Sequence, residues 1–393
     1  MVARHESYLK NIDTRLGEIE ALGRARRLRP VGRSSGGRIA LDGREFINFS
    51  SNNYLGLAHH PALIERATQW TRKWGAGATA SRLVCGTLDL HVGVEEKLAL
   101  GKKTEAALIF NSGFQANSSV LAALFDKDVA GPDPLVFSDR LNHASIHHGC
   151  KAAGVRQIRY QHRDMDHLES LLKQNADKPG PRFIITETVF SMDGDRADLD
   201  ALLDLKDRYG AFLYLDEAHA TGLFGADGFG LAPGRGADLI MGTFSKALGG
   251  FGAYIACSKK LRDYMVNRCA GFIYSTALPP AVLGSMDAAL DLLPGLGAAR
   301  ERLQKNAETV RKAFKGAGLD TGASSTQIVP LILGTETRAL KMAKALEDAG
   351  ILALAIRPPT VQKGASRIRF ALSAAHSDAD VASLIEAALD LAP

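Results

Sequence analysis

Two short runs near the middle of the chain bring together residue types that can do chemistry. The run L-Y-L-D-E-A-H ends an apolar stretch at Asp216 and His219, and D-L-I-M-G-T-F-S-K ends another at Lys246. Both apolar stretches have the length and composition of buried strands. The carboxyl ends of parallel strands meet at one edge of a sheet, where α/β proteins bind their ligands. The sequence therefore predicts that an acid, an imidazole and an amine share one pocket.

These three groups form the set that binds pyridoxal phosphate (PLP). A lysine amine forms a Schiff base with this cofactor, and a buried carboxylate pairs with the ring nitrogen, so that the ring accepts electrons from the substrate. We assign the first role to Lys246 and the second to Asp216, and we expect His219 to reach the phenolic oxygen. Glu217 is the less favoured ring partner, because alternate residues of a strand point to opposite faces.

Each of these residues has a simpler interpretation when it is taken alone. A lysine after a strand is more often a surface residue, and D-E-A-H can be a strand end that enters a loop. The neighbours of Lys246 favour a site, because Thr243 and Ser245 supply hydroxyls and the following glycines let the backbone approach a ligand. Desolvation and nearby cations are expected to lower the pKa of this lysine, which frees its amine to act as a base.

A glycine turn at residues 111–114 offers a place for the phosphate of the cofactor. The strand expected over 107–110 leads into N-S-G, and a helix is expected to begin near Phe114. The free amides and the dipole of a helix N-terminus attract anions, so we expect Gly113 and Phe114 to line the phosphate. One such turn is a weak signal, and it gains weight from the other PLP-binding groups.

Three further positions carry polar side chains near expected strands. His143, in D-R-L-N-H-A-S, either has a structural role or stacks on the pyridine ring, and the sequence does not decide between them. Ser191, in T-E-T-V-F-S-M-D-G-D, is in reach of the ring substituents. Arg367 and Arg369 share one face of an expected strand, where they are either exposed or a clamp for a substrate carboxylate.

The composition limits the class of protein. The chain has 393 residues, 46% of them hydrophobic, which is enough for a substantial core and two domains. A net charge of +5, from 48 basic and 43 acidic residues, suits anionic small molecules better than nucleic acid. The four cysteines lack metal-ligand spacing, so we expect no metal. The N-terminus lacks an apolar signal core and no segment is long enough to span a bilayer, so we expect a soluble, cytoplasmic protein.

Alternating apolar runs and helical segments predict an α/β fold with a mostly parallel central sheet. Residues 1 to about 30 are expected to form an amphipathic helix, and a hairpin with a turn at Asp42 and Gly43 follows it. The domains expected are an N-terminal helix and hairpin segment over 1–50, a large PLP-binding domain over 51–284 and a smaller α+β domain over 285–393. The strands expected in the large domain are 107–110, 135–138, 183–188, 212–216, 239–243 and 253–257.

With these residues in place, the chain resembles the α-oxoamine synthases, a family of PLP enzymes of fold type I. The resemblance covers nearly the whole chain, through S-S-N-N-Y-L-G-L, D-E-A-H-A-T-G, T-F-S-K-A-L-G-G, I-Y-S-T-A-L-P-P, R-P-P-T-V and S-R-I-R in that order. Several dispersed motifs in the right order are far more specific than any one of them.

The resemblance implies a role for each of these positions. Arg369 holds the carboxylate of an amino acid substrate, and Thr360 and Arg26 face an acyl substrate. Arg26 lies in the basic run R-A-R-R-L-R, which from its residues alone is either a solvated helix end or an anion contact. Thr276 reaches the phosphate from a neighbouring subunit, so a homodimer with shared active sites is implied. The implied cofactor contacts are Lys246, Gly113, Phe114, His143, Ser191, Asp216, His219, Thr243 and Thr276, and the catalytic set is Lys246, His143, Asp216 and His219.

The reaction that the resemblance implies is a decarboxylating condensation of an amino acid with an acyl thioester, in which Lys246 moves the α-proton. The motif A-I-R-P-P-T-V favours L-alanine and pimeloyl-CoA, or a pimeloyl carrier protein, in biotin biosynthesis. Siblings such as glycine C-acetyltransferase, aminolevulinate synthase and serine palmitoyltransferase stay open, because they share the catalytic residues. A PLP transaminase or decarboxylase and a non-catalytic partner subunit are more distant alternatives. Gln362 stands where the family often has proline, which leaves the acyl preference in question.

Overall fold

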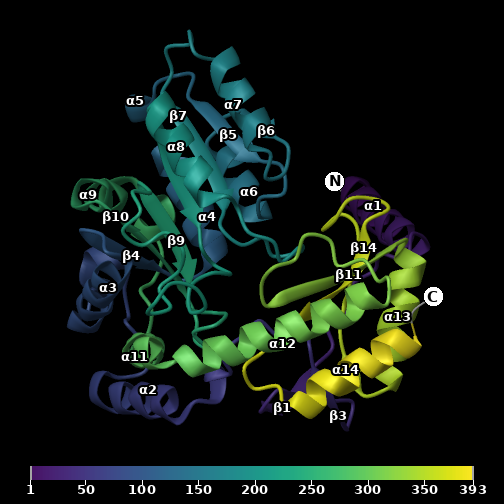
Figure 1. Ribbon diagram of the computed structural model, residues 1–393. Coiled ribbons are helices and arrows are strands. Elements are labelled where there is room, and N and C mark those ends of the chain that lie inside the picture. The colour runs from purple at the N-terminus through teal and green to yellow at the C-terminus, as the bar shows by residue number, and fades with distance from the viewer. Residues whose placement is uncertain (1, 392–393) are drawn as a thin grey trace.

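A seven-stranded sheet lies at the centre of the larger part of the structure, a computed structural model that describes residues 2–391 (Figure 1). β10 runs antiparallel to both of its neighbours, and the other adjacent strands are parallel. The predicted α/β fold with a mostly parallel sheet is therefore confirmed. In order across the sheet, the strands are β4 (Ala106–Phe110), β10 (Ala253–Cys257), β9 (Leu239–Thr243), β8 (Ala211–Asp216), β7 (Arg182–Glu187), β5 (Leu135–Asp139) and β6 (Gln157–Tyr160).

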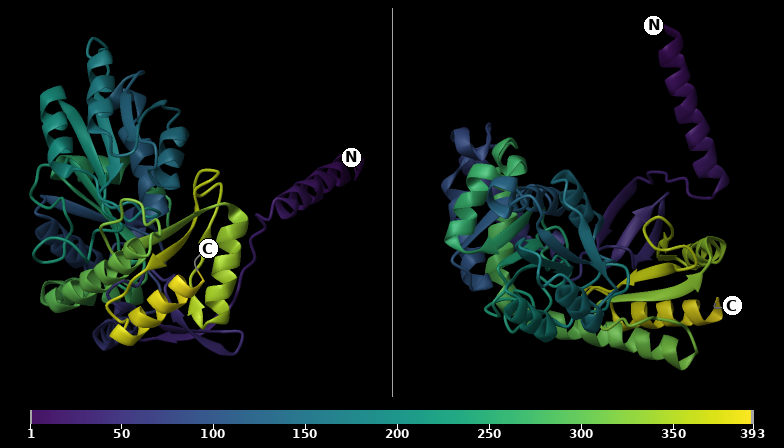
Figure 2. Two further views of the ribbon diagram at one scale, coloured as in Figure 1. Left: turned by 45° about the vertical axis from the view of Figure 1, so that its right-hand side comes forward. Right: turned by 90° about the horizontal axis from the view of Figure 1, so that it is seen from above.

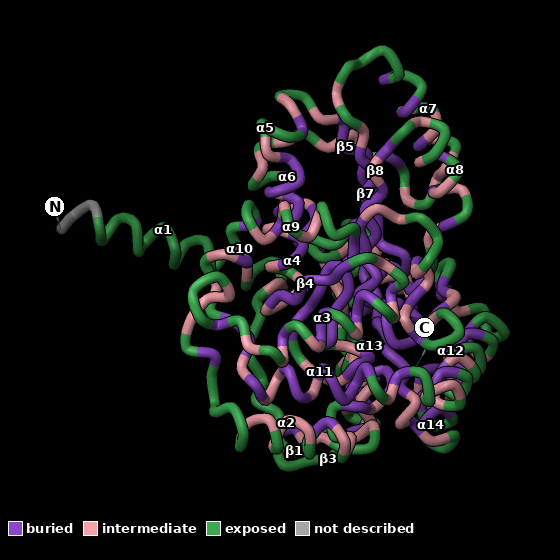
Figure 3. The backbone as a smooth tube through the Cα atoms, turned by 90° about the vertical axis from the view of Figure 1, so that its left-hand side faces the viewer, coloured by how far each residue is buried: buried purple, intermediate pink, exposed green. Residues whose placement is uncertain are grey.

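Helices cover both faces of this sheet because both faces are apolar. In β8, Leu213 and Leu215 belong to one buried cluster and Tyr214 belongs to the other, as expected for residues that alternate between faces. The first cluster includes residues of α3 (Asp89–Lys102), α7 (Met165–Gln174) and α8 (Leu199–Tyr209), and the second includes residues of α4 (Gly113–Leu124), α6 (Ala144–Ala152) and α9 (Lys259–Arg268). Figure 3 shows the central strands as buried segments between more exposed helices.

β6 is a strand that the sequence did not predict. It lies at the edge of the sheet, where it pairs with β5, and Tyr160 is the buried residue of its four. The run Q-I-R-Y is half exposed, so it lacks the continuous apolar pattern of strands that are covered on both faces.

The N-terminal helix is shorter than the sequence predicted. α1 spans Val2–Ala21, so the expectation of a helix to about residue 30 was wrong at its end. Gly23, with a φ of 63°, terminates it: the amide of Gly23 bonds to the Glu20 carbonyl at 2.8 Å, and the amide of Arg24 bonds to the Ile19 carbonyl at 3.0 Å. α1 projects from the body of the molecule, as Figure 2 shows. Its exposed apolar side chains include Tyr8, Leu9, Ile12 and Leu16.

The two ends of the sequence fold together. The predicted hairpin turns at Asp42 and Gly43, and β12, from the far end of the chain, pairs in parallel with β3. A three-stranded sheet in the order β11-β14-β13 lies in the same part of the molecule (Figure 1). The elements of this part are β1 (Val31–Ser35), β2 (Arg38–Leu41), β3 (Arg44–Asn48), β11 (Ile328–Gly334), β12 (Ile351–Leu352), β13 (Ala355–Ile356), β14 (Ser366–Ala371), α12 (Gly297–Gly316), α13 (Glu336–Asp348) and α14 (Asp378–Asp390).

Helix α11 packs closely on α2. A Cβ atom at Gly284 of α11 would lie 2.7 Å from the Arg66 carbonyl oxygen of α2, so a glycine permits this approach.

Within residues 2–391, no single helix has the length and apolar composition to cross a membrane. The α11 and α12 segments meet both criteria only when they are counted together, and they are bent by 79° relative to each other. The remaining helices are α2 (Pro61–Trp74), α5 (Lys127–Ala130), α10 (Ala270–Ile273) and α11 (Pro280–Leu292).

Gly249 packs the loop of Lys246 against a distant segment, and its substitution tests this contact. Its φ is 67°, and a Cβ there would lie 2.4 Å from Ala58 N and 2.5 Å from Leu57 C. We predict that Gly249→Ala lowers the free energy of unfolding by about 2–4 kcal/mol, through an unfavourable φ and overpacking. Urea unfolding of the cofactor-free protein measures the loss.

Gly210→Ala is the matched control for this prediction. Gly210 has a similar φ of 57°, but no atom lies within 4 Å of the Cβ position. Its substitution should therefore cost only the conformational part, about 1–2 kcal/mol. Equal losses for the two variants would show that the contact of Gly249 with residues 57–58 contributes nothing.

Candidate active site

Asp216 ends β8 as a buried carboxylate, 4% exposed, with a donor on each oxygen. Its Oδ2 accepts a hydrogen bond from Asn117 Nδ2 at 2.8 Å, and its Oδ1 accepts one from the Ala218 amide at 2.8 Å. The Tyr214 hydroxyl donates to Asn117 Oδ1 at 2.6 Å, which fixes the orientation of that amide. The carboxylate is therefore held in place from α4 and from its own strand end.

Lys246 follows β9 at the same edge of the sheet. Burial lowers the pKa of its amine, and the charge of Arg369 adds to this effect, whereas the charges of Asp216 and Glu187 oppose it. The expected direction of this pKa shift is confirmed. None of the hydrogen bonds formed within residues 2–391 involves its Nζ atom. The charge of Asp216 therefore acts on this amine although no hydrogen bond joins the two groups.

His219 lies in the turn after β8 and contacts Tyr54. Its Nδ1 is 2.8 Å from the Tyr54 hydroxyl, which is also 2.9 Å from Asn52 Oδ1. Burial lowers the pKa of His219 well below its usual value, and the charges of Lys246 and Arg369 act in the same direction, so the imidazole is neutral. The sequence did not point to Tyr54, because its motif S-S-N-N-Y-L-G-L only indicated a polar loop.

Arg369 and Arg367, on one face of β14, have different partners. Arg367 Nη1 forms an ion pair with Asp193 Oδ1 at 2.6 Å. Arg369 Nη2 donates to the Tyr54 hydroxyl at 3.0 Å and to Asn52 Oδ1 at 3.1 Å, and no carboxylate within residues 2–391 pairs with it. Of the two guanidiniums, Arg369 is therefore the one whose charge is available to a carboxylate ligand.

The turn before α4 has the features of an anion site. Ser112 caps the helix, because its hydroxyl accepts a hydrogen bond from the Gln115 amide at 3.2 Å. The amides of Gly113 and Phe114 form no hydrogen bond within the described part of the chain. Thr243 donates to the Gly252 carbonyl at 2.8 Å, and its oxygen lies 2.7 Å from the Ser245 hydroxyl.

His143 is connected to Asp216 through two side chains. It precedes α6, and its Nδ1 accepts from the Ser145 amide at 3.3 Å and lies 2.7 Å from the Ser145 hydroxyl. Asn117 Nδ2 donates to that hydroxyl at 2.9 Å, as well as to Asp216. Burial lowers the pKa of His143, and Asp216 partly opposes this. The structure thus brings His143 into the same network, a relation that the sequence left open.

Thr276 lies beside the turn before α4 of its own chain. Its carbonyl accepts a hydrogen bond from Asn111 Nδ2 at 3.1 Å, and it forms an isolated bridge with Ser81. Its side chain is exposed. The expectation that Thr276 reaches the cofactor phosphate in the site of a second subunit stays a prediction.

Arg26 contacts Thr360, although the two residues lie at opposite ends of the sequence. Arg26 Nη2 is 3.4 Å from Thr360 Oγ1. The other arginines of the run pair with carboxylates: Arg24 with Glu336, Arg27 with Glu20, and Arg29 with Glu347 and Asp42. Ser191, Thr360 and Gln362 line a common cavity of about 130 Å³. The two residues predicted to face an acyl group therefore lie together.

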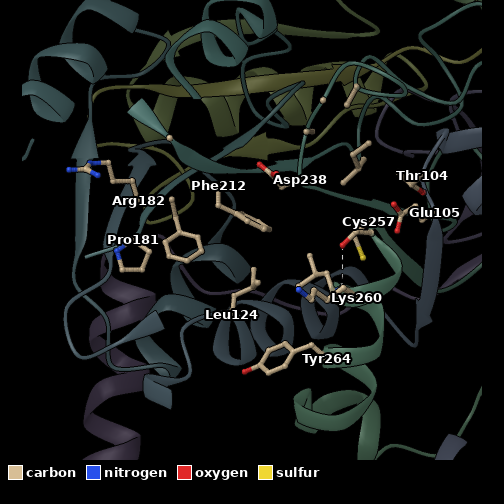
Figure 4. Close-up of a pocket in the computed structure, with 18 of the residues that line it drawn as sticks. Thr104, Glu105, Leu124, Pro181, Arg182, Phe212, Asp238, Cys257, Lys260 and Tyr264 are labelled. Carbon is tan, nitrogen blue, oxygen red and sulfur yellow. Dashed lines mark hydrogen bonds between the residues drawn. The ribbon is translucent and has the colours of Figure 1, made fainter. Parts of the chain in front are cut away.

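A larger cavity lies elsewhere in the described part of the chain. It has a volume of about 950 Å³, and Figure 4 shows Arg182, Phe212 and Asp238 among the residues around it. These residues lie at or near the starts of β7, β8 and β9, opposite the strand ends that carry Asp216 and Lys246. Within residues 2–391, no group of His, Cys, Asp or Glu side chains is arranged to hold a metal ion.

Comparisons with known proteins identify the family. The profile of the aminotransferase class I and II family matches residues 44–387. The chain belongs to this family. An 8-amino-7-oxononanoate synthase of Gluconacetobacter diazotrophicus is 56% identical over 382 residues, which are 96% of each chain. The protein of that name from Geobacter sulfurreducens is 46% identical over 96% of this chain and 97% of its own. The resemblance to the α-oxoamine synthases is therefore confirmed.

Solved structures agree with this assignment. A serine palmitoyltransferase of Sphingomonas wittichii superposes with a TM-score of 0.89 at 28% identity, covering 98% of this chain and 97% of its own. An 8-amino-7-oxononanoate synthase of Francisella tularensis superposes with a TM-score of 0.75 at 26% identity, covering 88% of this chain and 97% of its own. A further serine palmitoyltransferase, solved with PLP, has a TM-score of 0.90 at 27% identity. The predicted fold type I is confirmed.

His162 holds the loop that carries Ser191. Its Nδ1 lies 3.0 Å from Asp139 Oδ1, and its Nε2 lies 2.9 Å from Asp195 Oδ2; both carboxyl groups are buried. Burial favours the neutral ring, but the hydrogen bonds and charges of Asp139 and Asp195 outweigh it and raise the pKa of His162 to about 9. The imidazolium therefore joins the end of β5 to the loop after β7.

These ion pairs make the stability of the protein depend on pH. Because the pKa is raised in the folded state, the stabilisation is complete below the unfolded value of 6.5 and is lost as pH rises through about 9. We predict that the contribution of His162 to the free energy of unfolding falls by about 3 kcal/mol as the pH rises from 6.5 to about 9. Urea titrations of the wild type and of His162→Gln measure it. A difference between the two proteins that does not change with pH would contradict the prediction.

Proposed function

We propose that the chain is an 8-amino-7-oxononanoate synthase of biotin biosynthesis. It condenses L-alanine with pimeloyl-CoA, or with a pimeloyl group on a carrier protein, and releases CO₂ and the free thiol. The observation that carries this proposal is the match to relatives of that name at 46% and 56% identity across 96% of the chain. The serine palmitoyltransferases, which represent the sibling activities, match at only 26–28%.

The residues at the sheet edge fit PLP as the cofactor. When bound, PLP accepts the electron pair that is left on the α-carbon of the substrate. Lys246 would hold it covalently, Asp216 would bond to its ring nitrogen and His219 to its phenolic oxygen. The amides of Gly113 and Phe114 at the start of α4 would bind its phosphate. Three features support the fit: a buried carboxylate that is fixed by two donors, and, among residues 2–391, an amine and two helix N-terminal amides that form no hydrogen bond.

The remaining members of the cofactor site occupy its periphery. His143 would stack on the ring, and its link to Asp216 through Ser145 and Asn117 supports this role. Thr243 and Ser191, which follow or end strands at the same edge, would contact the ring substituents and the phosphate.

Lys246 also acts as the base of the reaction. Its Nζ takes the α-proton of the bound amino acid and returns a proton after CO₂ has left. The lowered pKa supports this role, because a base must be neutral at the working pH. Between these two proton transfers, the carbon–carbon bond forms at the acyl carbon as the thioester carbon–sulfur bond breaks, and CO₂ leaves only after this condensation.

Arg369 binds the substrate carboxylate. Its charge has no carboxylate partner among the described residues, and its position is fixed by Tyr54 and Asn52. The tyrosine also contacts His219, so the carboxylate site and the cofactor site share one hydrogen-bonded side chain. Such sharing fixes the distance between the two ligands.

Arg26 and Thr360 bind the acyl substrate. Among residues 2–391, no carboxylate pairs with the guanidinium of Arg26, unlike those of its neighbours, so Arg26 is suited to an anionic group such as a phosphate of coenzyme A or the free carboxylate of a pimeloyl chain. Gln362, in the cavity beside Thr360, is the position where acyl preference is most open to change.

The enzyme works as a cytoplasmic homodimer on small-molecule substrates, without nucleic acid or membrane as partners. Two features support the dimer. α1 projects from the body with apolar side chains exposed, which a second subunit would cover. Thr276 lies at the surface beside the phosphate turn, where it would contribute to the site of that second subunit. We assign residues 51–284 to a PLP-binding domain, 285–393 to a smaller domain and 1–50 to the N-terminal segment.

The division of work between the two arginines of β14 can be tested by exchange for lysine. We predict that Arg369→Lys raises the KM for L-alanine about 10–100-fold, because a bidentate, fixed donor is replaced by a mobile point charge. Arg367→Lys should leave this KM within about threefold of the wild-type value, because Arg367 forms an ion pair with Asp193. Steady-state kinetics with varied alanine decide between them. The reverse pattern would assign the carboxylate to Arg367.

A substrate panel tests the proposed function itself. Purified enzyme with PLP is offered alanine, glycine or serine, each with pimeloyl-, acetyl-, succinyl- and palmitoyl-CoA, and thiol release is measured. We expect alanine with pimeloyl-CoA to give the highest kcat/KM, by about 100-fold or more over the other pairs. Lys246→Ala is the inactive control. Turnover of glycine with acetyl-CoA, without turnover of alanine with pimeloyl-CoA, would reject the proposal in favour of a sibling synthase.

A further inference from the structure

A second buried carboxyl group lies beside Asp216. Glu187 is the last residue of β7, and Asp216 is the last residue of β8, the neighbouring parallel strand. The two residues are partners in the register of that pair, so their side chains leave the sheet on the same face. Glu187 is 2% exposed and Asp216 is 4% exposed. The site therefore contains two adjacent carboxyl groups that water hardly reaches.

Two such groups do not both ionise, because each charge repels the other in a medium that screens poorly. The hydrogen bonds decide which one does. Asp216 accepts N–H donors on both oxygens, from Asn117 and Ala218, and an ionised carboxylate is the form that such donors favour. The strand end of Glu187 is fixed through its backbone, where its amide donates to Asn142 Oδ1 at 3.3 Å.

We propose that Glu187 is a positioning residue that stays protonated at neutral pH, so that the pair holds one negative charge and Asp216 carries it. This inference rests on the proposed function, because Asp216 and Lys246 are taken as the partners of the cofactor. Its consequence is that the charge lies opposite the ring nitrogen, and that Lys246 faces one carboxylate rather than two.

The electrostatics of the surroundings agree with this assignment. Burial raises the pKa of Glu187 well above its usual value, and the charges of Asp216 and Asp139 act in the same direction. Lys246 and the backbone amide of His143 act in the opposite direction and are outweighed. An ionised Glu187 would raise the pKa of Lys246, so a neutral Glu187 keeps that amine available as a base.

The test compares neutral isosteres of the two acids. Glu187→Gln imitates a protonated carboxyl, and Asp216→Asn removes the charge from the matched position on the next strand. The PLP dissociation constant of each protein is measured at pH 7 by equilibrium dialysis. We expect Glu187→Gln to bind PLP within about threefold of the wild type and Asp216→Asn to bind it about 100-fold more weakly. Equal, large losses for both variants would overturn the proposal.

A readout on Lys246 separates this role from a purely structural one. The pH dependence of the chemical acetylation of Lys246 in cofactor-free protein reports the pKa of its amine. Glu187→Gln should leave this value unchanged near neutral pH, because a neutral group replaces a neutral group. A clear fall in the pKa of Lys246 on this substitution would mean that Glu187 is ionised, and would overturn the proposal.

A spectroscopic measurement on the wild type covers the case in which a variant does not fold. In cofactor-free protein with ¹³C-labelled glutamate, an infrared band of a protonated carboxyl group should persist at pH 7. Its absence would overturn the proposal without reference to any reaction. Failure of the substrate panel with this band present would instead reject the proposed function and leave the protonation of Glu187 standing.

Discussion

The structure of the site depends on the hydrogen bonds that hold one carboxyl group, that of Asp216, which is almost entirely removed from water. A polar group is buried in a protein at low cost only where hydrogen bonds replace its hydration. Here the donors are an amide of the same turn and Asn117 of α4. Because Asn117 also contacts Tyr214 and Ser145, the requirements of one carboxylate fix β8, α4 and the start of α6 relative to one another.

A second set of contacts extends this arrangement to the small sheet. Tyr54 lies between His219, which belongs to the central sheet edge, and Arg369, which belongs to β14. The hydroxyl is both donor and acceptor, so it can satisfy an imidazole and a guanidinium at once. The neighbouring Arg367 is neutralised by Asp193, and this leaves a single cationic group facing the site from that strand. The charge that this strand presents to the site therefore depends on which of its two arginines has a carboxylate partner, and not only on how many arginines it carries.

The parts of this picture that the sequence predicted share a physical origin. Apart from β6 at the edge, the strands of the central sheet are continuous apolar runs because helices cover both faces, and the residues that follow the parallel strands gather at one edge. Lys246, Asp216 and His219 follow from that rule. α1 ends just before Gly23, whose positive φ stops the helix, whereas the helix predicted from the sequence continues to about residue 30. The roles of Tyr54, Asn117 and Glu187 depend on strand register and on contacts between distant segments, such as residues 117 and 216, which no local pattern contains.

Contacts between distant segments also explain where sibling synthases can differ. The groups proposed to act on the amino acid come from the ends of β8 and β9 and from β14, and His219 and Arg369 share the Tyr54 hydroxyl, so a change in one of these two disturbs the other. The groups predicted to face the acyl chain come instead from Arg26 and Thr360, which the parallel pairing of β3 with β12 helps to bring into one region. They contact each other at 3.4 Å and share no hydrogen bond with Asp216, His219 or Arg369 among the described residues. We therefore expect substitutions around Gln362 to change the acyl group that is accepted without breaking a hydrogen bond of Asp216, His219 or Arg369, and Ser191, which lines the cavity of Gln362 and binds Arg369 through its carbonyl, is the point where the two regions meet.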